Sequence, residues 1–245
     1  MPDPSQDRPF ALITGAARRL GRAIALGLAK EGYAIGLHYH HSENDALQAA
    51  EEMRASGAPV SLFKADLAEP AQIEAMFAEI ERLQGRLDVL VNSAAIMTRG
   101  NLRQLDVDRW DATMALNLRA PWLCSRAAAR LMQSSGGVII NLSDSGARKT
   151  WTGYPAYIIS KAGLEALTRL LARTLAPAIR VNAVAPGLIL PPESMPAEEW
   201  LRLVKRLPAQ KAGSPEDIIS AVLFLIRNDY LTGQILVVDG GYQLI

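Results

Sequence analysis

Short apolar runs alternate along this chain with longer amphipathic stretches, and this alternation limits the fold more than any other feature. Strands of a parallel sheet are buried on both faces and read as continuous runs of Val, Ile and Leu, and helices must connect them. The sequence therefore predicts an α/β fold, a single doubly wound domain whose seven-stranded parallel sheet carries helices on both faces. The predicted strands are Phe10–Thr14, Ala34–Tyr39, Val60–Lys64, Leu87–Val91, Gly137–Leu142, Ile179–Val184 and Gln234–Val238, and the predicted helices cover about residues 20–31, 43–56, 70–84, 107–134, 153–175 and 215–227.

All 245 residues are assigned to one domain, because no linker or internal repeat interrupts the alternation. Residues 1–8 are polar and are predicted to be a flexible N-terminus. Residues 187–214 break the rhythm, since four prolines surround a short helical piece there. A long insertion directly after a strand is well placed to be a substrate lid, and we expect Met195 and Trp200 to contact the substrate.

Composition and charge exclude several classes of protein. Apolar residues make up 49% and charged residues 21% of the chain, which is typical of soluble globular proteins. The formal net charge of +1 and the lack of a basic block argue against nucleic acid or membrane as the main partner, so a small-molecule substrate is expected. Cys124 is the only cysteine, and neither a signal peptide nor a membrane-spanning run is evident, so a cytoplasmic location is expected.

A glycine turn, Thr14-Gly-Ala-Ala-Arg-Arg-Leu-Gly21, joins the first predicted strand to the first helix. Gly15 and Gly21 would let the backbone approach a pyrophosphate at the helix N-terminus, as in Rossmann-type domains. Arg19 stands where a further glycine would be expected. Its side chain is either a solvated arginine of the first turn or a two-point contact to a phosphate.

The three histidines all lie at the end of the second predicted strand, where an acidic residue would bind the ribose 2′-hydroxyl of NAD. No acid stands there. His40, His41 and Ser42, together with Arg19, could instead surround a 2′-phosphate, which indicates NADPH; the alternative is plain surface histidines. His38 and His40 share a strand face, but no cysteine or close third ligand accompanies them, so no metal site is predicted.

Tyr157 and Lys161 are four residues apart in a predicted helix and therefore project from the same face. A phenol with a pKa near ~10 is a poor acid–base catalyst at neutral pH, and a neighbouring ammonium group favours its ionised form. The pair is a candidate proton donor with a supporting cation.

The chain resembles the short-chain dehydrogenase/reductase family from about residue 9 onward, and the order and spacing of the shared motifs carry the resemblance. The matches are Thr14-Gly-Ala-Ala-Arg-Arg-Leu-Gly21, Asp66-Leu67, Asn92-Ser-Ala-Ala95, Asn117, Tyr157 with Lys161, Pro186-Gly187 and Asp239-Gly-Gly241. Within the family the chain is most similar to the pteridine reductase and dihydromonapterin reductase branch. That branch has Arg at the position of Arg19, a similar His-Tyr-His stretch, and Asp in place of the catalytic Ser.

The resemblance implies an NADPH-dependent reductase in which hydride passes from the nicotinamide to a C=N or C=O carbon while Tyr157 donates the proton. Lys161 would bind the nicotinamide ribose and lower the Tyr157 pKa. Asn117 would hold the backbone and a relay water, unless it is an ordinary hydrogen-bonding helix residue. A homotetramer built on helices 107–134 and 153–175 is also implied. The implied cofactor contacts are Gly15, Arg18, Arg19, Leu20, Gly21, His40, His41, Ser42, Asp66, Leu67, Asn92, Ala94, Tyr157, Lys161, Pro186, Gly187 and Ile189.

Asp144 lies thirteen residues before Tyr157, the position of the family's catalytic serine, and Ser143 and Ser145 flank it. Successive strand residues point to opposite sides, so the three cannot all face the site, and a one-residue shift in the loop would return a serine to the role. A hydroxyl can donate to a ketone oxygen, whereas a carboxylate accepts from N–H groups. Asp144 therefore suits an amino-substituted nitrogen heterocycle.

Three departures from the pteridine reductase branch concern the pocket. Met97 replaces a stacking aromatic residue, Ala95 replaces a serine, and Ile189 replaces a hydroxyl residue near the cofactor. Met97 either packs on a flat ring through its polarizable sulfur or simply fills the core. The alternative functions are a carbonyl reductase or alcohol dehydrogenase acting on a sugar, steroid or acyl ketone, and a non-catalytic NADP(H)-binding sensor, against which the Tyr157 and Lys161 pair counts.

Overall fold

The computed structural model describes residues 8–149, 151–192 and 195–245 of the chain. Its strands are β1 (Phe10–Ile13), β2 (Ala34–Tyr39), β3 (Val60–Lys64), β4 (Val89–Asn92), β5 (Gly137–Leu142), β6 (Ile179–Pro186) and β7 (Ile235–Val238). They form one parallel sheet of seven strands in the order β3-β2-β1-β4-β5-β6-β7. The predicted single α/β domain with a seven-stranded parallel sheet is confirmed. Residues 1–7 of the predicted flexible N-terminus lie outside the described residues.

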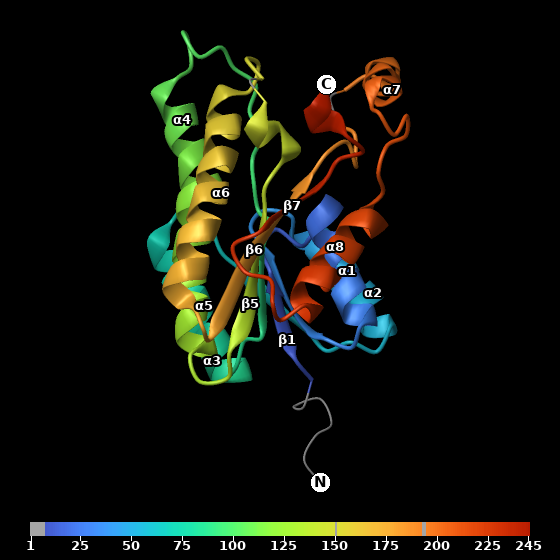
Figure 1. Cartoon of the computed structure of the whole chain (residues 1–245). Coiled ribbons are helices and arrows are strands. Elements are labelled where there is room, and N and C mark those ends of the chain that lie inside the picture. The colour runs from blue at the N-terminus through green and yellow to red at the C-terminus, as the bar shows by residue number, and fades with distance from the viewer. Residues whose placement is uncertain (1–7, 150, 193–194) are drawn as a thin grey trace.

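Helices cover both faces of this sheet (Figure 1). One face carries α1 (Arg19–Lys30), α2 (Glu43–Ala55) and α8 (Pro215–Arg227), and the other carries α3 (Pro70–Gln84), α4 (Val107–Met114), η1 (Ala115–Arg119), α5 (Ala120–Met132) and α6 (Pro155–Leu175). Each layer buries its own apolar cluster against the sheet, as the alternation of apolar runs and amphipathic stretches requires.

The predicted helix 107–134 is the main departure from expectation, because the structure divides it. Between α4 and α5 the residues Ala115–Arg119 form the π-helical turn η1, and Asn117 at its centre is fully buried. Its side-chain oxygen accepts a hydrogen bond from the backbone N–H of Ile96 at 2.9 Å. A π turn is often found at functional sites, and this one depends on a partner 21 residues away in the sequence.

The strand order reverses between β1 and β4, which are neighbours in the sheet. In an open parallel sheet, ligands bind beyond the carboxyl ends of the strands at such a reversal. Three further elements gather at this end of the molecule in Figure 1: η2 (Ser145–Arg148), α7 (Ala197–Arg206) and η3 (Tyr242–Leu244). No helix within the described part of the chain is long and apolar enough to cross a membrane.

Candidate active site

The glycine turn after β1 is pressed against the end of β4. Gly15 has a φ of +65°, and a Cβ added there would lie 2.9 Å from the Cα of Ala94. A Cβ on Gly21 would lie 2.3 Å from the carbonyl oxygen of Gly15. The Thr14 hydroxyl accepts hydrogen bonds from the N–H groups of Ser93 and Ala94, at 2.9 and 3.1 Å. The turn therefore has the tight, side-chain-free shape that a pyrophosphate needs in order to reach the backbone.

His38 fixes this turn by hydrogen bonds, a role that the sequence analysis missed. Its Nδ1 accepts a hydrogen bond from the Gly15 N–H at 3.0 Å, and its Nε2 donates to the Ala65 carbonyl at 3.0 Å. Both bonds require a neutral imidazole of one tautomer. Burial lowers the pKa of His38 from 6.5 to about 4. The only sequence signal for this role was the position of a histidine inside a fully buried strand.

We expect the free energy of unfolding to decrease as the pH falls from 6.5 toward about 4, because the unfolded chain binds the His38 proton at a higher pH than the folded protein does. The folded state binds fewer protons in that window, so stability rises with pH there, by about 3 kcal/mol in total if the full shift applies. Denaturant titrations across the window measure this. A His38→Gln variant can form both hydrogen bonds without titrating, and an unchanged pH slope in that variant would contradict the assignment.

The predicted 2′-phosphate region lies where β2 ends. The rings of His40 and His41 stack with centroids 3.5 Å apart, and His40 Nδ1 lies 3.9 Å from an oxygen of Asp66. Arg18 Nε lies 3.9 Å from a carboxylate oxygen of Asp45. Ser42 occupies the N-cap position of α2. The structure thus brings His40, His41 and Asp66 together at the end of β2.

Arg19 makes a contact that the sequence analysis did not foresee. Its Nη2 donates to the backbone carbonyls of Leu190 and Pro191, at 3.4 and 2.9 Å, where the predicted lid begins. The residue also has a φ of +51°, a left-handed conformation that strains a side chain other than glycine by about 1–3 kcal/mol. Such strain is usually retained at functional positions.

The three predicted catalytic groups Tyr157, Asp144 and Lys161 lie together. The Tyr157 hydroxyl donates to Oδ2 of Asp144 at 2.7 Å, and Oδ1 of Asp144 accepts from the Gly146 N–H at 2.7 Å. Lys161 Nζ donates to the Leu142 carbonyl at 2.6 Å and lies 5.7 Å from the centroid of the Tyr157 ring. A carboxylate, a phenol and an ammonium group therefore share one buried site.

Neither serine beside Asp144 takes its place. The Ser143 hydroxyl donates to Oε1 of Glu165 at 3.3 Å, and Glu165 is itself a buried residue of α6. The Ser145 hydroxyl is buried and has no hydrogen-bond partner among the described residues. The alternation of the chain thus directs the Asp144 carboxylate toward Tyr157, and the register shift that would substitute a serine does not occur in this structure.

The expected lowering of the Tyr157 pKa by Lys161 is wrong for this structure. Burial raises the Tyr157 pKa well above its ordinary value, and the charge of Asp144 and the hydrogen bond to it raise it further. Burial also lowers the pKa of Lys161, to about 8. The pKa of Asp144 is raised by burial, against the opposing effects of Tyr157, Gly146 and Lys161. The carboxylate touches the phenol directly and the ammonium group does not, so the carboxylate has the larger effect.

Asn117 ties the catalytic helix to the loop after β4. Its side-chain nitrogen donates to the Ile96 carbonyl at 2.8 Å and to the Ser160 hydroxyl at 3.1 Å. Asn92, predicted to contact the cofactor, instead places its amide in an internal network, where it donates to Oδ1 of Asn141 at 2.8 Å. A cofactor contact by Asn92 would therefore have to use its backbone.

The other predicted cofactor residues are mostly packing residues. Leu67 and Ile189 are buried, and Leu20 packs on the core. Gly187, which follows Pro186, donates its backbone N–H to the Val238 carbonyl at 2.9 Å. Their side chains carry no polar group that could bind the cofactor. No group of three or more His, Cys, Asp or Glu side chains among the described residues is placed to hold a metal ion.

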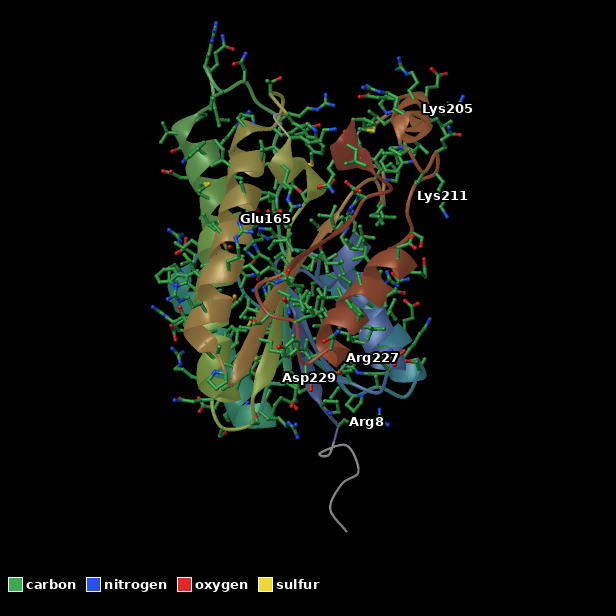
Figure 2. The ribbon with its side chains drawn as sticks, viewed as in Figure 1. Arg8, Glu165, Lys205, Lys211, Arg227 and Asp229 are labelled. Atoms are coloured by element: carbon green, nitrogen blue, oxygen red, sulfur yellow. The ribbon has the colours of Figure 1, made fainter. Side chains whose placement is uncertain are left out.

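The predicted lid contains α7, and Met195 and Trp200 are half-buried within it. Met97 is 42% exposed in the loop after β4. The pKa of Arg99 in the same loop is raised, first by its hydrogen bond to Tyr154 and also by the charge of Glu199 on α7. The lid therefore lies within electrostatic range of that loop, with the exposed Lys205 and Lys211 on its outer side (Figure 2).

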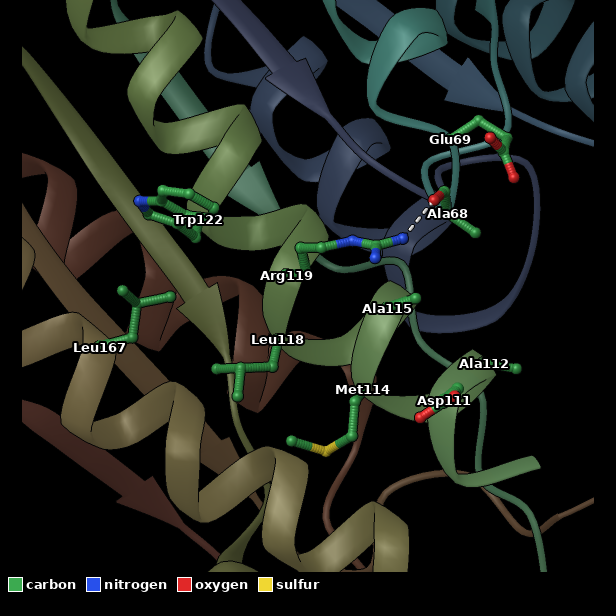
Figure 3. A pocket seen from close by; sticks show the side chains of 10 residues that line it. All are labelled: Ala68, Glu69, Asp111, Ala112, Met114, Ala115, Leu118, Arg119, Trp122 and Leu167. Carbon is green, nitrogen blue, oxygen red and sulfur yellow. Dashed lines mark hydrogen bonds between the residues drawn. The ribbon is translucent and has the colours of Figure 1, made fainter. Parts of the chain in front are cut away.

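A separate hollow of about 890 Å³ lies outside this site (Figure 3). Arg119 crosses one side of it and donates to the Ala68 carbonyl at 2.6 Å. Its lining residues are Ala68, Glu69, Asp111, Ala112, Met114, Ala115, Leu118, Arg119, Trp122 and Leu167. They come mainly from α4, η1 and α5, so the hollow belongs to the helical face and has no catalytic group of the Tyr157 site in its lining.

The doubly wound sheet, the glycine turn at its reversal and the buried Tyr157 and Lys161 pair define an oxidoreductase that uses a dinucleotide. The family model described as Enoyl-(Acyl carrier protein) reductase matches residues 15–243. The chain belongs to the short-chain dehydrogenase/reductase family.

Three proteins of known structure or activity illustrate what the chain is similar to. The 3-oxoacyl-[acyl-carrier-protein] reductase FabG of Staphylococcus aureus is 36% identical over 240 residues, which cover 96% of this chain and 98% of that protein. The crystal structure of FolM alternative dihydrofolate reductase 1 from Brucella canis, complexed with NADP, superposes with a TM-score of 0.92 at 31% identity and covers 97% of this chain and 94% of that one. Acetoin dehydrogenase YohF from Salmonella typhimurium superposes with a TM-score of 0.88 at 32% identity. The match covers 97% of this chain and 96% of that one.

Proposed function

We propose that the protein is an NADPH-dependent reductase that reduces a C=N bond of an amino-substituted nitrogen heterocycle, such as a dihydropteridine. The observation that carries the proposal is the 2.7 Å hydrogen bond between the Tyr157 hydroxyl and the Asp144 carboxylate. A family member built to reduce only ketones has no use for a buried carboxylate at this place, because it repels a carbonyl oxygen. Substrate N–H groups are its natural partners.

Each catalytic group has one task in this proposal. Substrate N–H groups occupy the Asp144 oxygens and release the Tyr157 hydroxyl to donate its proton to the ring nitrogen. The raised Tyr157 pKa keeps the phenol protonated until that transfer. Lys161 provides the positive charge that stabilises the phenolate left behind. NADPH, when bound, supplies the hydride that adds to the adjacent carbon.

The glycine turn fits the cofactor, since a side chain at Gly15 or Gly21 would collide with Ala94 or with the Gly15 carbonyl and force open the tight turn that lets the backbone approach a pyrophosphate. The NADP complex of the Brucella canis relative supports the choice of cofactor. A second candidate function is reduction of a 3-oxoacyl or other ketone, which the Staphylococcus aureus relative favours.

The decisive test is NADPH oxidation by the purified protein with dihydropteridines, dihydrofolate, a 3-oxoacyl thioester and acetoin. The proposal expects kcat/KM to be highest for a pteridine or folate substrate. Highest activity with the thioester or with acetoin would replace it by the second candidate. Binding of NADPH without turnover of any substrate would identify a sensor.

Cofactor preference is expected to be NADPH over NADH, because no acidic residue stands at the end of β2. His41→Ala and Arg19→Gly should each weaken NADPH binding about 10- to 100-fold, the worth of one charged hydrogen bond, while NADH binding changes little. Arg22→Ala is the matched control, since Arg22 lies on the same helix as Arg19 and pairs with Glu52 at 2.6 Å. Equal or tighter binding of NADH by the wild type would remove this expectation.

We also propose that the chain assembles as a homotetramer through the helical face of Figure 3. Trp122, Ile159 and Leu170 are 44%, 42% and 65% exposed on α5 and α6, more apolar surface than one face packed on a sheet needs. Light scattering at micromolar concentration should give four times the mass of the chain. The mass of a single chain would end the proposal.

A further inference from the structure

Three aromatic side chains, Trp151, Tyr154 and Tyr242, gather near the loop that carries Asp144. The ring centroid of Trp151 lies 5.7 Å from that of Tyr242 and 6.4 Å from that of Tyr154. The Trp151 indole also rests on Gly146, because a Cβ there would lie 2.7 Å from the indole and 2.9 Å from Oδ1 of Asp144. The indole thus packs directly on the loop that presents the carboxylate.

Tyr242 comes from the other end of the chain and is fixed in place by Lys149. Lys149 Nζ donates to the Tyr242 carbonyl at 2.8 Å and to the Ile245 carbonyl, and it lies 4.2 Å from the centroid of the Tyr242 ring. Asp239 accepts bonds from the N–H groups of Gly241 and Gln243, both at 2.8 Å. The Lys149 bonds hold the Tyr242–Ile245 segment beside η2, and η3 contacts η2.

The two tyrosines of the cluster, Tyr154 and Tyr242, interact with different residues. The Tyr154 hydroxyl accepts a hydrogen bond from Arg99 Nε at 2.7 Å, so this residue is engaged with the loop after β4. The pKa of Tyr242 is raised, first by burial and then by the charge of Asp144. Tyr242 therefore lies within electrostatic range of the catalytic carboxylate, although 98 residues separate the two in the sequence.

We propose that Trp151 and Tyr242 form a specificity-determining wall beside Asp144 that selects a flat, ring-containing substrate over an extended acyl chain. This inference rests on the proposed reductase function and names the class of substrate for the same site. Aromatic faces hold a flat ring in offset or edge-to-face contact, and a favourable pair changes affinity by about 2- to 10-fold beyond the area it buries. An acyl chain has no face to stack.

The test compares Trp151→Leu and Tyr242→Leu, which remove a ring and keep apolar bulk, with Tyr154→Leu as the control from the same cluster. The two wall variants should raise KM for a dihydropteridine about 10-fold, leave its kcat within about 2-fold, and leave kcat/KM for a 3-oxoacyl thioester unchanged. Tyr242→Phe keeps the ring and should behave as the wild type. The Kd for NADPH should not change in any of them.

Equal losses for the pteridine and for the 3-oxoacyl thioester would show that the cluster only supports the fold, and an unchanged KM would show that the wall does not touch the substrate. Either result overturns the inference while leaving the reductase function intact. If the wild type turns over neither substrate, the proposed function fails. Direct titration of the pteridine into protein saturated with NADP⁺ then tests the wall alone, since Trp151→Leu must still weaken that binding about 10-fold.

Discussion

Replacing Tyr157 by phenylalanine should lower kcat by about 10²- to 10⁴-fold, the usual contribution of a positioned general acid. The substitution removes the hydroxyl that donates to Asp144 and leaves the buried ring in place. Little contact area is lost, so the Kd for NADPH should stay within about 2-fold of the wild type. Steady-state kinetics with the best substrate and a fluorescence titration of the cofactor measure the two quantities.

Tyr154→Phe is the control for that experiment, because this neighbouring phenol is bonded to Arg99 and not to Asp144. Its kcat should remain close to that of the wild type. Retention of most activity by Tyr157→Phe would show that the assigned role is wrong, and Tyr154 would become the next candidate proton donor.

Replacing Asp144 by serine should reduce activity toward a dihydropteridine about 10- to 100-fold, the worth of roughly 1.5–3 kcal/mol for a hydrogen bond to a charged group. Activity toward a plain ketone should be kept or improved, because a hydroxyl can donate to a carbonyl oxygen. The melting temperature should fall modestly, because serine loses the hydrogen bonds that the Asp144 carboxylate accepts from the Tyr157 hydroxyl and the Gly146 N–H.

Ser143→Ala is the matched control, since Ser143 is adjacent but contacts Glu165. If Ser143→Ala or Ser145→Ala inactivates the enzyme while Asp144→Ser does nothing, a serine faces the substrate. The substrate would then be a carbonyl compound, and the pteridine proposal would be wrong.

The sheet could be predicted from the sequence because each of its strands is a local apolar run with its own turn signals. The break in the helix 107–134 could not, because η1 depends on the bond between Asn117 and the Ile96 backbone, which only the folded chain brings together. The ends of the strands also differ from the predicted ends, because contacts between distant residues fix them. Thr14, predicted as the end of the first strand, turns its hydroxyl to Ser93 and Ala94 instead.

Within the site, the family's spacing of thirteen residues indicated Asp144 but left its two flanking serines as alternatives, and only the folded loop shows that Asp144 bonds to Tyr157. The direction of the Tyr157 pKa was not predictable, since it depends on burial that no motif records. Trp151 and Tyr242 were missed because they lie far apart in the chain and meet only through the packing of η3 on η2.

Under the proposed function, Arg19 links the cofactor site to the segment at Leu190 and Pro191. Its Nη2 donates to two carbonyls at the start of the predicted lid, and these bonds are lost if the same Nη2 turns to a phosphate. Linkage is reciprocal, so if phosphate binding breaks these bonds, it loosens the Leu190–Pro191 segment by the same factor by which the bonds weaken phosphate binding. The strained backbone at Arg19 thus belongs to the one residue on which both phosphate binding and the position of the Leu190–Pro191 segment would depend.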